Sequence, residues 1–99
     1  MQTQLKSITR KIIPTLKRQG VVKAALFGSM VRGEAKKKSD VDILVRFDER
    51  KSLLDLMRLQ FILEDKLGRK VDLLTYGSVH PMLRNTILND QKIFYEKKS

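Results

Sequence analysis

The chain has 99 residues, no cysteine and a formal net charge of +10, with 41% hydrophobic and 32% charged residues. Too little apolar material is present for two independent cores, so we expect one domain over residues 1–99. Disulfides and thiolate metal sites are excluded, and the lack of a membrane-length apolar run or a secretory signal favours a cytoplasmic protein. The positive charge either attracts nucleotides, nucleic acid or an acidic partner, or simply keeps the surface solvated.

The first half of the chain alternates between helical and strand patterns. Apolar residues at helical spacing predict a helix over residues 4–19, which Pro14 either kinks or shortens. Residues 21–27 are typical of a buried strand that Gly28 breaks. We then expect a short helix over residues 29–35, a basic loop, and a second strand.

The second strand, residues 41–47, has the clearest pattern in the chain. Ser52 is expected to cap the following helix with Asp55 in capping-box position, and Gly68 to end it. The apolar stripe expected to face the core comprises Leu53, Leu56, Met57, Leu63 and Leu67.

The last third of the chain repeats the alternation. A third strand is expected over residues 71–76, and a final helix from residue 79 or 81 to residue 88 or 89. The tail around residues 93–95 either adds a short strand or packs as coil. Together these patterns predict an α/β (α+β) domain with a small mixed sheet of three to four strands flanked by helices.

Three aspartates interrupt the apolar strands. Asp40 and Asp42 are two positions apart at the start of one strand and therefore share a face, and Asp72 lies in another strand. The side chains that alternate with the first two point into the core: Val41, Ile43 and Val45. If the two strands pair, three like charges meet, and a divalent cation with oxygen ligands such as magnesium would relieve their repulsion. Each aspartate taken singly also fits turn chemistry or solvation of a strand end.

Gly28 and Ser29 end the first strand at the entrance to a predicted helix. A glycine lets phosphate approach the backbone, and a helix amino terminus offers unpaired N–H groups. Arg32 could reach a phosphate oxygen or anchor the loop to a carboxylate such as Glu34. An ordinary strand-to-helix turn has the same sequence, and the Walker pattern of a P-loop is missing.

The continuous stretches 26–35 and 39–45 together resemble the active-site motif of the DNA polymerase-beta-like nucleotidyltransferase superfamily, a Gly-Ser loop followed by an Asp-x-Asp strand. The short chain and the Arg-Gly-Glu after Gly-Ser resemble the minimal nucleotidyltransferase (MNT) family, and residues 67–74 resemble its third-aspartate segment. The resemblance covers residues 26–88. Val31 stands where the family commonly has alanine, and the run 36–38 is more basic than is usual.

The resemblance implies that Asp40 and Asp42 bind two magnesium ions, that Asp72 completes the site and can accept the hydroxyl proton, and that Gly28 and Ser29 hold the triphosphate of ATP. It also implies a partner, because MNT proteins are commonly antitoxins of HEPN-domain ribonuclease toxins and can add AMP to a toxin tyrosine. The HEPN motif itself is absent, since the single histidine, His80, has no arginine at the required spacing and is better explained as a helix-start residue.

Three functions therefore stay open. The first is an antitoxin that transfers AMP from ATP, the second is an antitoxin that neutralises its partner by contact alone, and the third is a nucleotidyltransferase acting on RNA or a small molecule. Nucleic acid is the less favoured partner, because 99 residues leave little room for an acceptor-binding domain. No membrane partner is expected.

Overall fold

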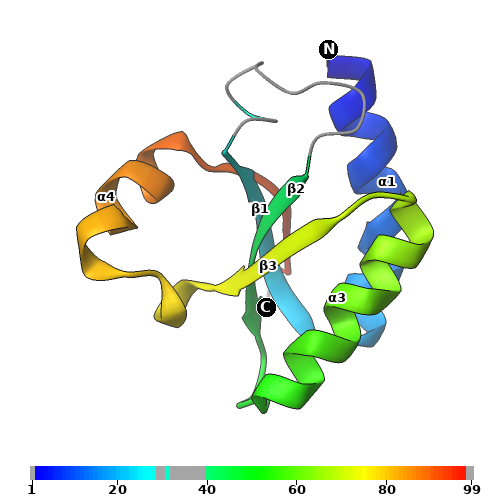
Figure 1. Ribbon diagram of the computed structural model, residues 1–99. Coiled ribbons are helices and arrows are strands. Elements are labelled where there is room, and N and C mark those ends of the chain that lie inside the picture. Colours follow the sequence, from blue (N-terminus) through cyan, green and yellow to red (C-terminus); the bar gives the residue numbers. More distant parts are fainter. Residues whose placement is uncertain (1, 29–30, 32–39, 98–99) are drawn as a thin grey trace.

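The computed structural model describes residues 2–28, 31 and 40–97 (Figure 1). Its elements in chain order are α1 (Gln2–Arg18), β1 (Val21–Phe27), β2 (Val41–Phe47), α3 (Leu53–Leu67), β3 (Val71–Thr75), the 3-10 turn η1 (Tyr76–Ser78), α4 (Pro81–Asp90) and β4 (Lys92–Glu96). The four strands form one mixed sheet in the order β3-β2-β1-β4. The predicted α/β class and strand number are confirmed. None of the helices in these described ranges is long and apolar enough to cross a membrane.

The sheet is mixed because its two halves are built differently. β1 pairs antiparallel with both β2 and β4, whereas β2 pairs parallel with β3. The parallel pair needs a crossover connection, which α3 provides. The tail forms strand β4, which decides between the two expectations for residues 93–95.

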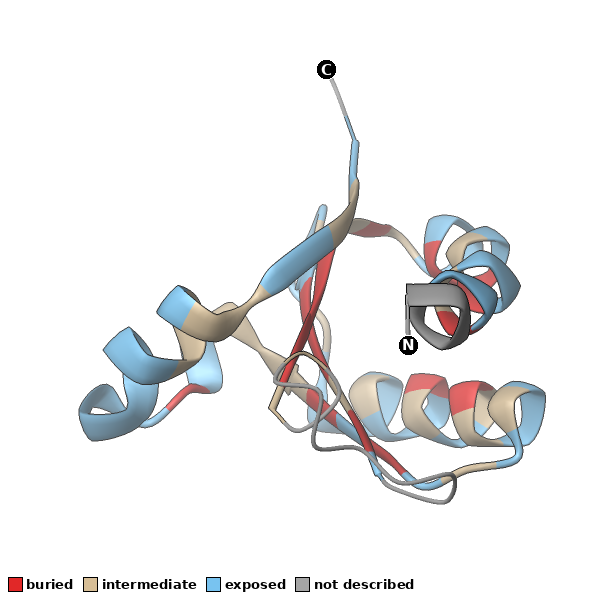
Figure 2. Ribbon diagram, turned by 90° about the horizontal axis from the view of Figure 1, so that it is seen from above, coloured by how far each residue is buried: buried red, intermediate tan, exposed pale blue. Residues whose placement is uncertain are grey.

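Helices cover the two sides of the sheet unequally. Figure 2 shows α1 and α3 on one side and α4 on the other, where it stands away from the strands. The core on the side of α1 and α3 is formed by Ile8, Ile12, Leu16, Val21, Ala24, Leu26, Val41, Ile43, Val45, Leu59, Leu63, Val71 and Leu73. The α4 side holds a smaller buried cluster of Ala25, Phe27, Leu44 and Val79. Most buried apolar side chains therefore lie on the side of α1 and α3. The α4 side has room for polar side chains.

Several element boundaries differ slightly from expectation. α1 continues through Pro14, so this proline removes a backbone donor without ending the helix. β3 ends at Thr75 because Tyr76 starts a 3-10 turn, and α4 extends to Asp90. His80 caps α4, since its Nδ1 accepts the Met82 N–H at 3.1 Å, as expected for a helix-start residue. The short helix predicted over 29–35 and the basic loop after it lie, apart from residue 31, outside the described residues.

The caps of α3 follow the sequence closely. The Ser52 hydroxyl accepts the Asp55 N–H at 3.2 Å, and the Asp55 carboxylate accepts the Ser52 N–H at 3.1 Å. The Ser52 hydroxyl also donates to the Asp55 carboxylate at 3.0 Å, and the two bonds that the carboxylate accepts from Ser52 hold the pKa of Asp55 below its usual value. Gly68 ends the helix in the left-handed region at φ 64°. Both predicted caps are confirmed.

The predicted apolar stripe of α3 is partly wrong. Leu53 is 73% exposed and Met57 44% exposed, whereas Leu59 and Leu63 are buried. The sequence offers two overlapping apolar stripes on this helix, and only packing against α1 and the sheet selects between them. The apolar side chains of the other stripe are exposed on the surface: Leu53, Leu54, Met57 and Phe61.

A matched pair of substitutions on α3 tests this assignment. We expect Leu63→Ala to lower the free energy of unfolding by about 2–5 kcal/mol, because it leaves a cavity in the core. The same truncation at the exposed Leu53 should cost less than about 0.5 kcal/mol. Urea denaturation of the two variants measures both values, and equal losses would contradict the packing described.

Candidate active site

Two carboxylates stand opposite each other in the sheet. In the parallel ladder between β2 and β3, Asp42 is the partner of Asp72. Residues paired across adjacent strands point to the same side, and such strands lie about 4.8 Å apart. The residues that alternate with them are buried against α1 and α3: Val41, Ile43, Val71 and Leu73. Both aspartates therefore face the α4 side, Asp42 half-buried and Asp72 exposed. The pairing that the sequence could only suppose is present.

Asp40 lies just before β2 and is exposed. The Val41 N–H donates to the Lys70 carbonyl at 2.9 Å, so the residues that precede β2 and β3 are held together. Asp40 is thereby placed at the same end of the sheet as Asp42 and Asp72. Within the described ranges, however, no three acidic, histidine or cysteine side chains gather closely enough to hold a metal ion. The three-carboxylate ligand set thus stays a prediction, and the structure pairs two of its three members, Asp42 and Asp72.

A glutamate that the sequence analysis did not single out holds β3 in place. The Glu64 carboxylate accepts the Val71 N–H at 2.9 Å, while its backbone carbonyl accepts the Gly68 N–H at 2.8 Å. One residue near the end of α3 thus ties both the helix end and the strand that carries Asp72. No local pattern signals this contact, because a carboxylate on a helix surface has the same sequence context whether or not it bonds to a strand.

Gly28 brings the end of β1 against Asp42. β1 and β2 pair Phe27 with Asp42, and Gly28 follows with φ 77°, a conformation that L side chains rarely adopt. A Cβ added at Gly28 would collide with the Asp42 carboxylate. The Val31 N–H donates to the Gly28 carbonyl at 3.2 Å. Glycine is required here on two counts, its backbone conformation and the close carboxylate.

Ser29 and Arg32, the other predicted nucleotide-binding residues, lie outside the described residues, as does the basic run 36–38. Their assignment continues to rest on the sequence.

The described donors fit a hard divalent cation. Ionised carboxylates supply the oxygen ligands that magnesium prefers, and it leaves its remaining positions to water and phosphate oxygens. Asp42 and Asp72 face the same side in register, and Gly28 adds no side chain beside them. These observations support the prediction that Asp40, Asp42 and Asp72 hold magnesium, and it stays a prediction.

Comparison with known families decides the assignment. Residues 9–94 match the family described as "Nucleotidyltransferase domain". The chain belongs to this family. It is 56% identical over 86 residues to a Methanocaldococcus jannaschii protein named as an inferred protein adenylyltransferase, covering 87% of this chain and 92% of that one. It is also 48% identical over 73 residues to the protein adenylyltransferase MntA of Thermococcus cleftensis, covering 74% of each. The chain is accordingly a nucleotidyltransferase.

Solved structures agree on the fold. A structure named as an inferred minimal nucleotidyltransferase has a TM-score of 0.77 and 37% identity, covering 91% of this chain and 92% of that one. A toxin–antitoxin structure with AMP-PNP has a TM-score of 0.79 and 25% identity, covering 90% and 73%. A complex of a tri-AMPylated Shewanella oneidensis HEPN toxin with its MNT antitoxin has a TM-score of 0.74 at 22% identity, covering 93% and 72%. The resemblance to minimal nucleotidyltransferases is confirmed.

Gly28→Ala should separate activity from stability. We expect it to abolish or strongly reduce nucleotidyl transfer, because the added methyl group displaces the Asp42 carboxylate. Gly68→Ala is the matched control, since Gly68 is also left-handed but has nothing within 4 Å of an added Cβ. Each substitution should cost about 1–2 kcal/mol of stability from backbone strain. Equal activity of the two variants, measured per folded molecule, would disprove the role of the Gly28–Asp42 contact.

Asp42→Asn tests whether this carboxylate serves chemistry or structure. We expect transfer to be lost, while the metal-free protein stays as stable as the wild type or becomes slightly more stable, because the charge opposite Asp72 is removed. Asp65→Asn on the exposed surface of α3 removes the same charge and should keep transfer activity. A marked fall in the metal-free melting temperature of Asp42→Asn alone would make Asp42 a structural residue.

Proposed function

We propose that this nucleotidyltransferase moves AMP from ATP onto a tyrosine hydroxyl of a HEPN-domain toxin and so acts as a cytoplasmic antitoxin. The observation that carries the proposal is the Asp42–Asp72 pair beside Gly28, in a chain whose relatives are named protein adenylyltransferases. The toxin assignment draws support from the solved MNT–HEPN complex, which shares this fold.

The reaction is a displacement at the α-phosphorus of ATP. The acceptor oxygen forms a bond to that phosphorus, the bond to the bridging oxygen of the β-phosphate breaks, and pyrophosphate leaves. Bound magnesium would supply positive charge to polarise the α-phosphate and neutralise the leaving group. Transfers of this kind depend on positioning and electrostatics more than on covalent chemistry, so a small site suffices.

The chain's own residues divide the remaining work. Asp40 and Asp42 supply ligand oxygens at one end of β2, and Gly28 lets the triphosphate approach the backbone beside them. In this proposal Asp72 accepts the proton of the attacking hydroxyl, a role supported by its exposure on the same side of the sheet as Asp42. Ser29 and Arg32 complete the phosphate contacts in this proposal.

Intact mass spectrometry of the partner toxin tests the proposal. The toxin is incubated with this protein, ATP and magnesium, and in parallel with an Asp40→Asn/Asp42→Asn double variant. We expect one or more added AMP masses with the wild type and none with the double variant. A stable complex without added mass would replace transfer by neutralisation through contact, and transfer to RNA or to a small molecule instead would replace the acceptor.

A further inference from the structure

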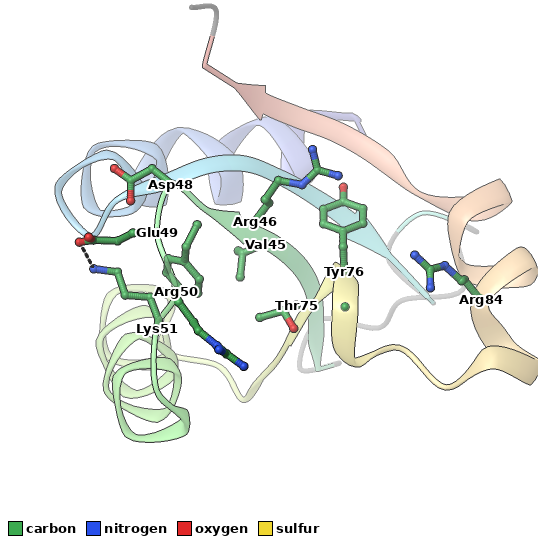
Figure 3. A pocket seen from close by; sticks show the side chains of 11 residues that line it. Val45, Arg46, Asp48, Glu49, Arg50, Lys51, Thr75, Tyr76 and Arg84 are labelled. Carbon is green, nitrogen blue, oxygen red and sulfur yellow. Dashed lines mark hydrogen bonds and ion pairs between the residues drawn. The ribbon is translucent and has the colours of Figure 1, made fainter.

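A basic pocket lies at the end of the sheet opposite the aspartates. It has a volume of about 550 Å³ and forms where β3 leaves the sheet at Thr75 while β2 continues through Arg46. Figure 3 shows side chains from three segments around it: Arg46 from β2, Arg50 and Lys51 from the loop before α3, and Arg84 from α4. Nothing in the nucleotidyltransferase motif accounts for this cluster.

Among the described residues, three of these cations have no acidic partner. Lys51 is paired with Glu49 at 3.3 Å, which neutralises both. For Arg46, Arg50 and Arg84 no ion pair is formed with any residue that the structure describes. Arg50 and Arg84 are also exposed. Three guanidinium groups around one hollow leave bidentate donors available to anionic oxygens.

Tyr76 forms a fixed wall of the pocket. Its hydroxyl donates to the Gln91 side-chain oxygen at 2.7 Å, and burial raises the pKa of Tyr76, so the hydroxyl stays protonated. Its ring lies under two cations, with Lys23 Nζ 5.1 Å and the Arg46 guanidinium carbon 5.4 Å from the ring centroid. The ring thus fixes Arg46 and is not free for other stacking.

Arg46, which lines the pocket, lies on the same side of the sheet as Asp42 and Asp72. Asp42 and Arg46 are four residues apart on β2, so both point to the α4 side, about 13 Å apart at the usual strand rise. Leu44 lies between them and is fully buried in a cluster with Val79, so a bound chain does not lie directly along the strand. A chain that occupies the pocket reaches the aspartates by passing over this cluster.

We propose that this pocket is a docking subsite for an acidic segment of the acceptor protein. Carboxylates of that segment bind Arg46, Arg50 and Arg84, and a hydroxyl of the same acceptor protein is held at the Asp42–Asp72 pair. The subsite rests on the proposed function for its role in transfer. In this proposal part of the chain's large positive charge serves to recognise the acceptor protein, and not the nucleotide.

The pocket fits carboxylates better than a nucleic acid strand. Single-stranded nucleic acid is commonly bound by exposed aromatic rings on which bases stack, and the Tyr76 ring is already covered by cations. Asp48 and Glu49 also line the pocket and repel any anion, so the preference for a peptide rests on the Tyr76 ring, which offers bases no free face for stacking.

The test uses an Arg50→Gln/Arg84→Gln double variant, because both side chains are exposed and neither supports Tyr76. An Arg10→Gln/Arg58→Gln double variant removes the same charge from exposed positions on α1 and α3 and is the matched control. Binding of a fluorescein-labelled hexaglutamate peptide and of a labelled 20-nucleotide single-stranded RNA is measured by anisotropy. The KM for the HEPN-domain toxin is measured in the transfer reaction.

We expect the pocket variant to bind hexaglutamate about tenfold more weakly or worse and to raise the toxin KM similarly, while the control variant matches the wild type. Unchanged peptide affinity, or equal loss in both variants, would overturn the subsite. Selective loss of RNA affinity with unchanged peptide affinity would also overturn it and indicate a nucleic-acid site. If the wild type transfers no AMP but the pocket variant alone loses peptide binding, the subsite stands and the proposed transfer fails.

Discussion

The parallel pairing of β2 with β3 is the constraint on which the site depends. It places Asp42 opposite Asp72, and the buried valines that open both strands, Val41 and Val71, are partners in the same ladder. A slip of one residue would turn one aspartate into the core beneath α1 and α3. The burial of the alternate positions therefore sets the geometry of the carboxylates. The same strand register therefore fixes both the buried side chains of the core and the carboxylates on the opposite side of the sheet.

The antiparallel partner of β2 supplies the other half of the site. Because β1 runs opposite to β2, its carboxyl end meets the amino ends of β2 and β3, and Gly28 arrives beside Asp42 without a long connection. The antiparallel direction of β1 and the left-handed conformation of Gly28 together bring the backbone close to the Asp42 carboxylate. The cost is a pair of like charges on one side of the sheet, which a bound cation would offset.

The two sides of the sheet have different roles. The side covered by α1 and α3 holds the large core and thus most of the hydrophobic stabilisation. The α4 side is lightly packed, and α4 itself has no buried residue. Asp42, Asp72 and Arg46 all lie on this lightly packed side. Polar side chains that must meet ligands are placed where their exposure costs the core little.

The sequence by itself determined what depends on neighbours along the chain. The strands at residues 21–27 and 41–47 and the Ser52–Asp55 capping box were predicted, because propensity, capping and alternation act over a few residues. The Gly-Ser and Asp-x-Asp motif pointed to the family by resemblance. Only the tertiary structure decided which stripe of α3 is buried, that Asp72 lies opposite Asp42, and that arginines from three segments surround one pocket. Those outcomes depend on contacts between segments far apart in the chain, and a local pattern carries no information about its distant partner.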